Sequence, residues 1–123
     1  MGYMHQTFLD GKGVFACRDC HTHFALRSCI ESRQYTGQYG RAILFTDVVN
    51  VRAGEEDKRS MITGVHIVRD IFCMRCNKYV GWTYVKAFEI DQKFKEGKFI
   101  LERELIYDLK REFSVDPAEL NWS

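Results

Sequence analysis

CRDC at residues 17–20 and CMRC at residues 73–76 decide the fold of this 123-residue chain. Each stretch contains two cysteines separated by two residues, the spacing at which a tight turn presents two thiolates to one metal ion. Two such turns supply four sulfurs, which is a complete tetrahedral set for zinc, at zinc–sulfur distances of about 2.3 Å. The sequence therefore predicts one structural Zn²⁺ that joins two distant segments through these ligands: Cys17, Cys20, Cys73 and Cys76.

Two alternatives to a metal site are open for these cysteines. A redox C-x-x-C pair normally stands at the start of a helix that follows a strand. Neither HTHF at residues 21–24 nor NKYVG at residues 77–81 opens an amphipathic helix. Two independent thiol pairs without a metal would leave the matched spacing unexplained. His21 and His23 lie beside the first pair, but four cysteines already complete the ligand set.

The composition limits the classes of partner. Lys plus Arg number 18 and Asp plus Glu number 17, so the formal net charge is +1. Proteins that bind phosphate backbones usually have a clear basic excess, and we therefore expect no general nucleic-acid binding. Arginines spread over the expected strands could form an RNA-binding patch, but such residues are usually a solvated face: Arg27, Arg33, Arg41, Arg52 and Arg69.

Cysteine usage and hydropathy indicate the compartment. Of the five cysteines, Cys29 lies outside the two matched pairs. A metal-bound set plus one free thiol is typical of a reducing compartment, the cytosol or the nucleus. The sequence has no apolar run long enough to cross a membrane and none that would form the core of a signal peptide.

Most of the remaining sequence predicts strands, because β-branched and aromatic residues recur in short runs with few helical patterns. The expected strand regions are residues 14–16, 42–51, 61–72, 79–86 and 98–106, the last as one long strand. The charged run AGEEDKRS at residues 53–60 is expected to be a solvated hairpin connection, and residues 91–97 a turn or a single helical turn. The sequence thus predicts a single all-β domain.

A series of motifs around the cysteine pairs resembles the Yippee-like proteins. In chain order they are YTGQYGRA at 35–42, VVN at 48–50, TGVHIVRD at 63–70, GWTY at 81–84 and KEGKFILE at 95–102. The resemblance covers roughly residues 8–106. The VN pair at 49–50 and the KEGKFILER ending at 95–103 are most similar to the Yippee-like five branch and its fungal counterparts.

The resemblance implies a β-tent fold, in which two antiparallel sheets meet at an angle with one zinc ion at the apex. It implies a single Yippee domain over residues 1–123, with a core at about 8–106 and a polar C-terminal tail at 107–123, in which Pro117 could open a short helix. For the five branch it further implies a non-catalytic interaction or adaptor subunit of the GID/CTLH ubiquitin ligase. Such a subunit would be found in the nucleus and cytoplasm.

A ligand pocket is the alternative function. Trp82 and Tyr84 share one strand face, and three further residues lie on strands that could neighbour it; the candidate set is Phe45, Asn50, His66, Trp82 and Tyr84. An aromatic cage could hold a modified residue through cation–π attraction, or a flat imide. In cereblon-like relatives the tryptophan after the second cysteine pair helps wall a ligand pocket, and Trp82 matches that position. The other interpretation is aromatic packing in a small core, with a hydrogen-bonded core histidine at His66.

Catalysis of the sulfoxide-reductase type is not expected. That chemistry needs an exposed thiolate nucleophile beside acid–base groups. The only spare thiol, Cys29, lies early in the chain, whereas the related reductases place theirs on a late strand, and residues 98–105 contain no cysteine. Cys29 is more simply interpreted as a small core residue.

Overall fold

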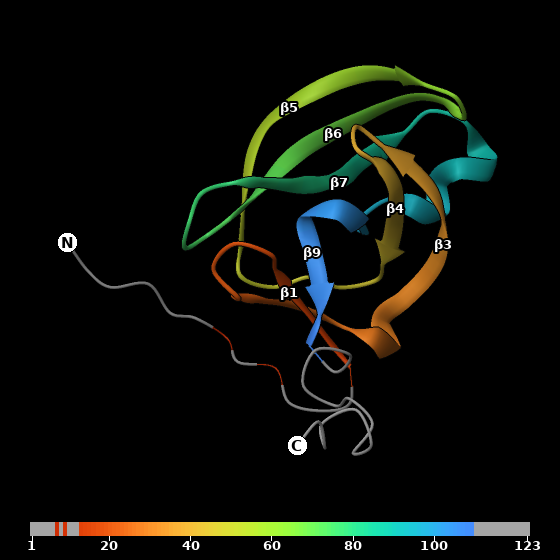
Figure 1. Cartoon of the computed structure of the whole chain (residues 1–123). Helices are drawn as coiled ribbons and strands as arrows, with labels where there is room; N and C mark the ends of the chain where they lie inside the picture. Colours follow the sequence, from red (N-terminus) through yellow and green to blue (C-terminus); the bar gives the residue numbers. More distant parts are fainter. Residues whose placement is uncertain (1–6, 8, 10–12, 110–123) are drawn as a thin grey trace, which may run out of the picture.

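The computed structural model describes residues 7, 9 and 13–109, which form two antiparallel sheets (Figure 1). The smaller sheet has the order β2-β1-β9: β1 (Val14–Cys17), β2 (His23–Leu26) and β9 (Ile106–Asp108). The larger sheet has the order β3-β4-β8-β7-β6-β5: β3 (Ile30–Gly37), β4 (Gly40–Phe45), β5 (Val51–Met61), β6 (Gly64–Cys73), β7 (Tyr79–Ala87) and β8 (Phe99–Glu102). Three short 3₁₀ helices connect strands: η1 (Arg27–Cys29), η2 (Ile90–Lys95) and η3 (Arg103–Leu105). This confirms the all-β, two-sheet expectation.

None of the helices in the described part of the chain is both long and apolar enough to span a bilayer.

Near its centre the larger sheet is apolar and buried on both faces. In β4, Ala42 and Leu44 point to one face and Ile43 and Phe45 to the other, and all four are almost fully buried. One face packs against the smaller sheet in a cluster that we call the intersheet core, which includes Phe15, Phe24, Ile43, Phe45, Ile71, Leu101 and Ile106. The opposite face contains a second cluster, the outer cluster: Ala42, Leu44, Val68, Trp82, Tyr84 and Ile100.

The charged run at residues 53–60 is a strand, not a hairpin connection. β5 continues through it from Val51 to Met61 and pairs with β6 over almost its whole length. β5 is an edge strand of the larger sheet, and most of its side chains are at least partly exposed. Charged side chains are typical of such an edge, because they discourage pairing with another chain. The prediction was wrong because the charge pattern of an exposed edge strand resembles that of a loop.

The expected long strand at residues 98–106 is divided between the two sheets. β8 ends at Glu102, the η3 turn follows, and β9 then pairs with β1 in the smaller sheet. A buried carboxylate at Glu102 ends the apolar run, as described below. Tyr107 and Asp108, where the polar tail was expected to begin, belong to β9. Pro117 and the rest of that tail from residue 110 lie outside the described residues.

The glycine of the GWTY motif is required by a close approach between strands. Gly81 pairs with Leu101 across β7 and β8. A Cβ at Gly81 would lie 1.9 Å from the carbonyl oxygen of Ile100, which is well inside van der Waals contact. Any other residue would therefore push β8 away from β7, directly beside Trp82.

Candidate functional site

The two cysteine turns have the same backbone geometry. In the first, the Cys17 carbonyl accepts a hydrogen bond from the His21 N–H at 2.9 Å; in the second, the Cys73 carbonyl accepts one from the Asn77 N–H at 2.8 Å. His21 and Asn77 both adopt the left-handed conformation, with φ of 67° and 65°. Each turn thus reverses the chain just after its second cysteine, so that both sulfurs of a pair point the same way.

The four cysteine sulfurs converge. Cys17 Sγ lies 3.6 Å from Cys76 Sγ, and Cys20 Sγ lies 3.4 Å from Cys73 Sγ. All four sulfurs lie within 4.8 Å of one another. A tetrahedral ion with metal–sulfur bonds of about 2.3 Å has sulfurs about 3.8 Å apart, so the set fits such an ion. The structure therefore brings the predicted ligands together around a single metal position.

The electrostatics of the cluster also favour a cation. Burial raises the pKa of the Cys17 thiol to about 12. Burial opposes ionisation of Cys20 as well, but hydrogen bonds from Thr22 outweigh it and lower the pKa of that thiol to about 7. Four thiolates this close repel one another unless a cation lies among them. A bound metal ion would supply that charge and hold the two turns together.

Asn50, a predicted pocket residue, instead connects the two cysteine turns. Its backbone carbonyl accepts a hydrogen bond from the Met74 N–H in the second turn at 3.0 Å. Its side-chain Nδ2 donates to the His23 carbonyl, just after the first turn, at 2.7 Å. Asn50 is held in the left-handed conformation, with φ of 61°, which asparagine tolerates better than most residues. Its role is therefore structural.

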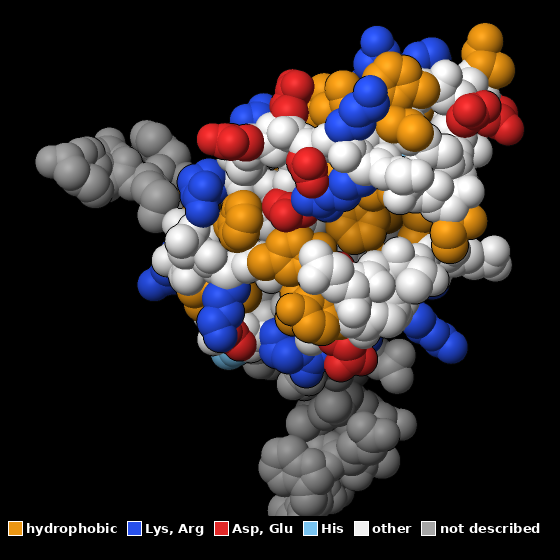
Figure 2. Space-filling view, turned by 90° about the horizontal axis from the view of Figure 1, so that it is seen from above, with side chains coloured by type: hydrophobic (Ala, Val, Ile, Leu, Met, Phe, Trp, Pro, Cys, Tyr) orange, Lys and Arg blue, Asp and Glu red, His pale blue; other side chains and the backbone are white. Residues whose placement is uncertain are grey.

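A cavity of about 830 Å³ lies over the outer cluster, on the face of the larger sheet away from the smaller one. It is lined by Ser32 and residues 34–38 from β3 and its turn, by residues 59–63 at the β5–β6 tip, by Trp82 and Tyr84 of β7, and by Gln92, Phe94 and Lys95 of η2. β3 and β5 are the two edge strands of this sheet, so the sheet curls to bring both edges around one space. Figure 2, which views the molecule from above, shows hydrophobic side chains exposed on this side with acidic and basic side chains around them.

Trp82 and Tyr84 line this cavity from one strand, as their alternation predicts. Their rings meet edge to face with centroids 6.3 Å apart. Only 6% of Trp82 is exposed, and its Nε1 has no hydrogen-bond acceptor in the described structure. Burial raises the pKa of the Tyr84 phenol to about 12, an effect moderated by the nearby indole N–H of Trp82. The cavity thus presents an unused donor.

Lys95 of η2 also lines the cavity, although only 2% of this residue is exposed. Its Nζ donates a hydrogen bond to Thr63 Oγ1 at 2.9 Å and lies 5.2 Å and 5.3 Å from the ring centroids of Tyr35 and Tyr84. Burial lowers the pKa of Lys95 from its ordinary value. The aromatic faces and one hydroxyl hold the ammonium group, with no carboxylate in ion-pair contact among the described residues.

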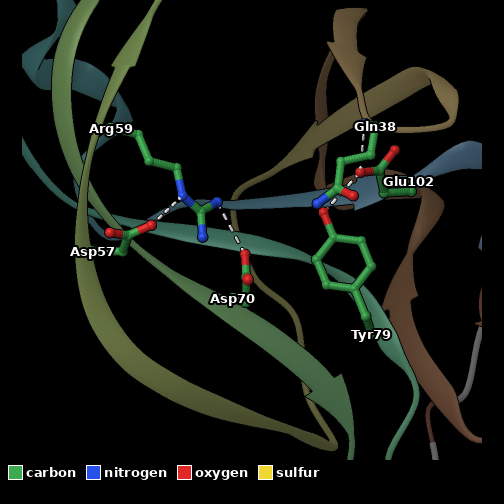
Figure 3. A network of polar contacts seen from close by, with 6 residues as sticks. All are labelled: Gln38, Asp57, Arg59, Asp70, Tyr79 and Glu102. Atoms are coloured by element: carbon green, nitrogen blue, oxygen red, sulfur yellow. Dashed lines mark hydrogen bonds and ion pairs between the residues drawn. The ribbon is translucent and has the colours of Figure 1, made fainter.

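One wall of the cavity is the β3–β4 hairpin, which is held by a buried carboxylate. Glu102 accepts hydrogen bonds from the Gln38 backbone N–H at 2.9 Å and from the Tyr79 hydroxyl at 2.7 Å (Figure 3). It also accepts one from the Tyr39 backbone N–H at 3.2 Å. A Cβ on Gly37 would overlap this carboxylate, 2.2 Å from Glu102 Oε1. Gly37 of the YTGQYGRA motif and Glu102 of the KEGKFILE motif are therefore in direct contact.

The opposite wall contains a cation whose charge is neutralised. Arg59 Nε lies 2.7 Å from Asp57 Oδ2, and Arg59 Nη1 lies 3.0 Å from Asp70 Oδ1 (Figure 3). The contact with the Asp70 carboxylate is the main cause that raises the pKa of Arg59. Of the two cationic side chains in the cavity lining, Arg59 is therefore paired with carboxylates and Lys95 is not.

The structure does not bring all five predicted pocket residues together. Phe45 is fully buried in the intersheet core, where its ring meets Phe15 at 5.5 Å. His66 lies behind Tyr84, with ring centroids 5.3 Å apart and its Nδ1 3.0 Å from the Gly64 carbonyl, and does not line the cavity. Sequence reasoning missed Lys95, because it lies in a charged run, DQKFKEGK, that is typical of solvent-exposed residues.

Comparisons with known proteins agree with the two-sheet fold and the cysteine site. Residues 13–115 match a family profile described as Yippee zinc-binding/DNA-binding/Mis18, centromere assembly. A yippee-like protein from Arabidopsis thaliana is 50% identical over 103 residues, which are 84% of this chain and 80% of the relative. Protein yippee-like 3 from Danio rerio is 46% identical over 98 residues, 79% of this chain and 82% of the relative.

Among solved structures, the crystal structure of the Mis18 'Yippee-like' domain is similar with a TM-score of 0.62. The likeness covers 80% of this chain and 95% of that chain at 19% identity, and it therefore concerns the fold alone. Since a plant yippee-like protein shares half of the aligned residues and the family profile spans most of the sequence, the chain belongs to the Yippee–Mis18 family.

Proposed function

We propose that the chain is a non-catalytic interaction subunit, stapled by one structural zinc ion, that works within the GID/CTLH ubiquitin ligase. The motif resemblance to the Yippee-like five branch supports the choice of complex. Cys29 packs against the intersheet core and is not part of the cavity lining, which supports a non-catalytic role. We also propose the nucleus and cytoplasm as its location, which a fluorescent fusion at native expression would test.

The observation behind this proposal is an exposed apolar surface at one end of the larger sheet. It comprises side chains at the β5–β6 tip and around η2, which we call the apolar rim: Ile62, Phe88, Ile90 and Phe94. Ile62 is fully exposed and Ile90 is 86% exposed. Ile62 and Phe94 both line the cavity described above, and exposed apolar side chains that lie close together are typical of a protein-binding surface.

Affinity purification of the tagged chain from cells that express it tests the proposal. We expect ubiquitin-ligase subunits to co-purify, and an Ile90→Asp, Phe94→Ser double variant to lose them. Tyr39→Ser is the matched control, because Tyr39 is an exposed aromatic residue on the other hairpin and outside the rim. Recovery of no ligase subunit with the unaltered chain would contradict the proposal.

The zinc part of the proposal is tested separately. Elemental analysis of the purified chain should find about one zinc per molecule, because the four converging sulfurs form one tetrahedral set. A chain that binds no metal yet melts cooperatively would exclude it.

A second candidate function is the binding of a small ligand or a modified residue. It is favoured by the cavity of about 830 Å³, which is lined by Trp82, Tyr84 and Tyr35 and lies within the size range of small-molecule sites. Titration of candidate ligands with tryptophan fluorescence as the signal tests it, with Trp82→Phe as the control for signals from the other tryptophan. A response that persists in Trp82→Phe would place binding elsewhere.

A further inference from the structure

The cavity has an unbalanced charge. The residues that line it include Arg59 and Lys95 but no Asp or Glu. The Arg59 guanidinium has Asp57 and Asp70 as partners. The buried Lys95 ammonium has only the Thr63 hydroxyl and two aromatic rings, so one of its three N–H groups is used in the described structure. Asp91 acts on this ammonium only from beyond ion-pair distance, and an anion that enters the cavity would place a counter-charge in contact with it.

A second donor lies against the same aromatic ring. Trp82 Nε1 is buried without an acceptor in the described structure, and both the indole and the Lys95 ammonium contact Tyr84. The other buried side-chain atom without a partner in the lining is Gln92 Oε1, in a carboxamide that can instead present its N–H₂ after a half turn. Among the buried side chains of the lining, the unused hydrogen-bonding capacity is therefore mainly that of the donors of Lys95 and Trp82.

We propose that the cavity binds a carboxylate-bearing ligand, whose carboxylate accepts hydrogen bonds from Lys95 Nζ and Trp82 Nε1. An apolar stem next to the carboxylate would lie against Tyr35 and Phe94, which also line the cavity. The proposal deepens the second candidate function above and rests on it. Charge-assisted hydrogen bonds of this kind are about twice as strong as neutral ones, which makes the carboxylate the main recognition element.

The same geometry argues against a cationic ligand such as a methylated lysine. A cation–π cage needs free aromatic faces. Here the faces of Tyr35 and Tyr84 already lie beside the Lys95 ammonium. A second cation in this space would meet a like charge at short range.

The carboxylate could come from a free small acid or from the C-terminus of a peptide. The probes are therefore two matched pairs: 4-phenylbutanoate with 4-phenylbutanamide, and the peptide acetyl-Gly-Gly-Phe with a free or an amidated C-terminus. Binding is followed on the full chain through the indole N–H signal of Trp82 in ¹H–¹⁵N spectra, assigned with Trp122→Phe. We expect each acid to shift this signal and its amide to bind at least about tenfold more weakly.

Lys95→Met keeps most of the side-chain volume and removes the charge. We expect it to abolish the preference for acid over amide while the melting temperature stays equal or rises, because an unpaired buried charge is removed. Lys86→Met is the matched control, since Lys86 is exposed on β7 and does not line the cavity. If Lys95 has only a structural role, Lys95→Met will lower the melting temperature and leave the preference for acid over amide unchanged.

The outcomes separate this inference from the proposal on which it rests. Equal binding of acid and amide at the Trp82 signal would overturn the carboxylate assignment and leave the ligand cavity standing. No response to any of the four probes would overturn the carboxylate assignment, and a flat response to the other candidate ligands as well would overturn the ligand cavity. A response to the peptide pair alone, or to the small-molecule pair alone, would support the inference and identify the source of the carboxylate.

Discussion

The region around the two cysteine turns (the cysteine end) and the region around the cavity (the cavity end) differ in how their buried polar groups are hydrogen-bonded. At the cysteine end the four sulfurs converge, Asn50 joins both turns by hydrogen bonds, and Lys78 pairs with Asp19 from one turn to the other. At the cavity end, the buried Lys95 ammonium donates to Thr63 Oγ1 alone, and the buried Trp82 Nε1 has no acceptor in the described structure.

The polar groups at the cysteine end therefore stabilise the fold, whereas those at the cavity end are available to bind another molecule. Proteins usually satisfy buried polar groups within themselves, and exceptions are expected at functional sites. The cysteine end satisfies its own groups and needs one cation to complete it. The cavity end leaves donors unused, and it is there that we propose a second molecule binds. Substitutions at the cysteine end should therefore lower stability, and substitutions at the cavity end should weaken ligand binding.

The largest effect is expected from loss of a metal ligand. Cys17→Ser should unfold the domain, because zinc bound by four thiolates contributes on the order of 10 kcal/mol in small domains, compared with a total stability of about 5–15 kcal/mol. Circular dichroism on heating, together with zinc content, measures this. Cys29→Ser is the control, since Cys29 lies outside the sulfur cluster, and it should retain zinc and a cooperative melt. A native-like melt of metal-free Cys17→Ser would remove the contrast between the two ends.

Substitution of Glu102 tests how much the cavity wall contributes to stability, compared with the cysteine end. The Glu102 carboxylate accepts hydrogen bonds from two backbone N–H groups and one phenol. In Glu102→Gln one of its oxygens becomes an N–H₂ group, which cannot accept and faces another donor. We expect a loss of about 1.5–3 kcal/mol in the free energy of unfolding, measured by urea denaturation. Glu31→Gln, which removes a more exposed ion pair with Lys98, should cost about 1 kcal/mol or less. Equal losses in the two variants would argue against a special role for Glu102.

Tyr79 gives the same wall a dependence on pH. Burial, and then the hydrogen bond to Glu102, raise the pKa of the Tyr79 phenol above its ordinary value of 10.0. Above pH 10 the unfolded chain releases this proton while the folded chain keeps it, so the stabilisation is complete below pH 10 and is lost as the pH rises further.

Tyr79→Phe should therefore cost about 1–2 kcal/mol at pH 8 and show a shallower loss of stability toward pH 11. Urea midpoints of both proteins at the two pH values measure the difference, in which the raised pKa values of Tyr35 and Tyr84 cancel because both proteins contain them. Parallel pH profiles would show that Tyr79 titrates alike in the folded and unfolded chains.

The smallest effect on stability is expected at the rim of the cavity. Ile62 is fully exposed at the β5–β6 tip, so Ile62→Ser should change the free energy of unfolding by no more than about 0.5 kcal/mol. The same variant should weaken binding of 4-phenylbutanoate, because Ile62 also lines the cavity. A clear loss of stability would mean that the cavity end contributes to the fold, and the comparison of the two ends would then fail.

The sequence predicts those parts of the fold that depend on local signals. The cysteine spacing is local to each turn, and it predicts a convergent set that the structure confirms. Alternation within a strand is also local, and Trp82 and Tyr84 share a face as expected. The assignment of residues 53–60 failed because only the neighbouring strand β6 makes this charged run a strand, and that pairing is not visible in the run itself.

The candidate site shows the same limit more sharply. Phe45 and Trp82 are both buried aromatics, but they face opposite sides of the larger sheet, and the register of β4, β8 and β7 that decides this is a property of the assembled sheet. Lys95 is buried only because η2 folds back against Tyr35 and Tyr84. A lysine among charged neighbours carries no sign of burial in the sequence.

The distance along the chain between the two cysteine turns has a consequence for how the protein is made. All of β2 to β6 lies between them, and β1 also needs β9 from near the end of the described residues. During translation the first pair of thiols therefore lacks the other two ligands of the metal site until more than half of the chain has left the ribosome. Oxidants and competing metal ions have their best opportunity in that interval, and the yield of correctly assembled protein should depend on the redox state and metal supply of the cell during synthesis.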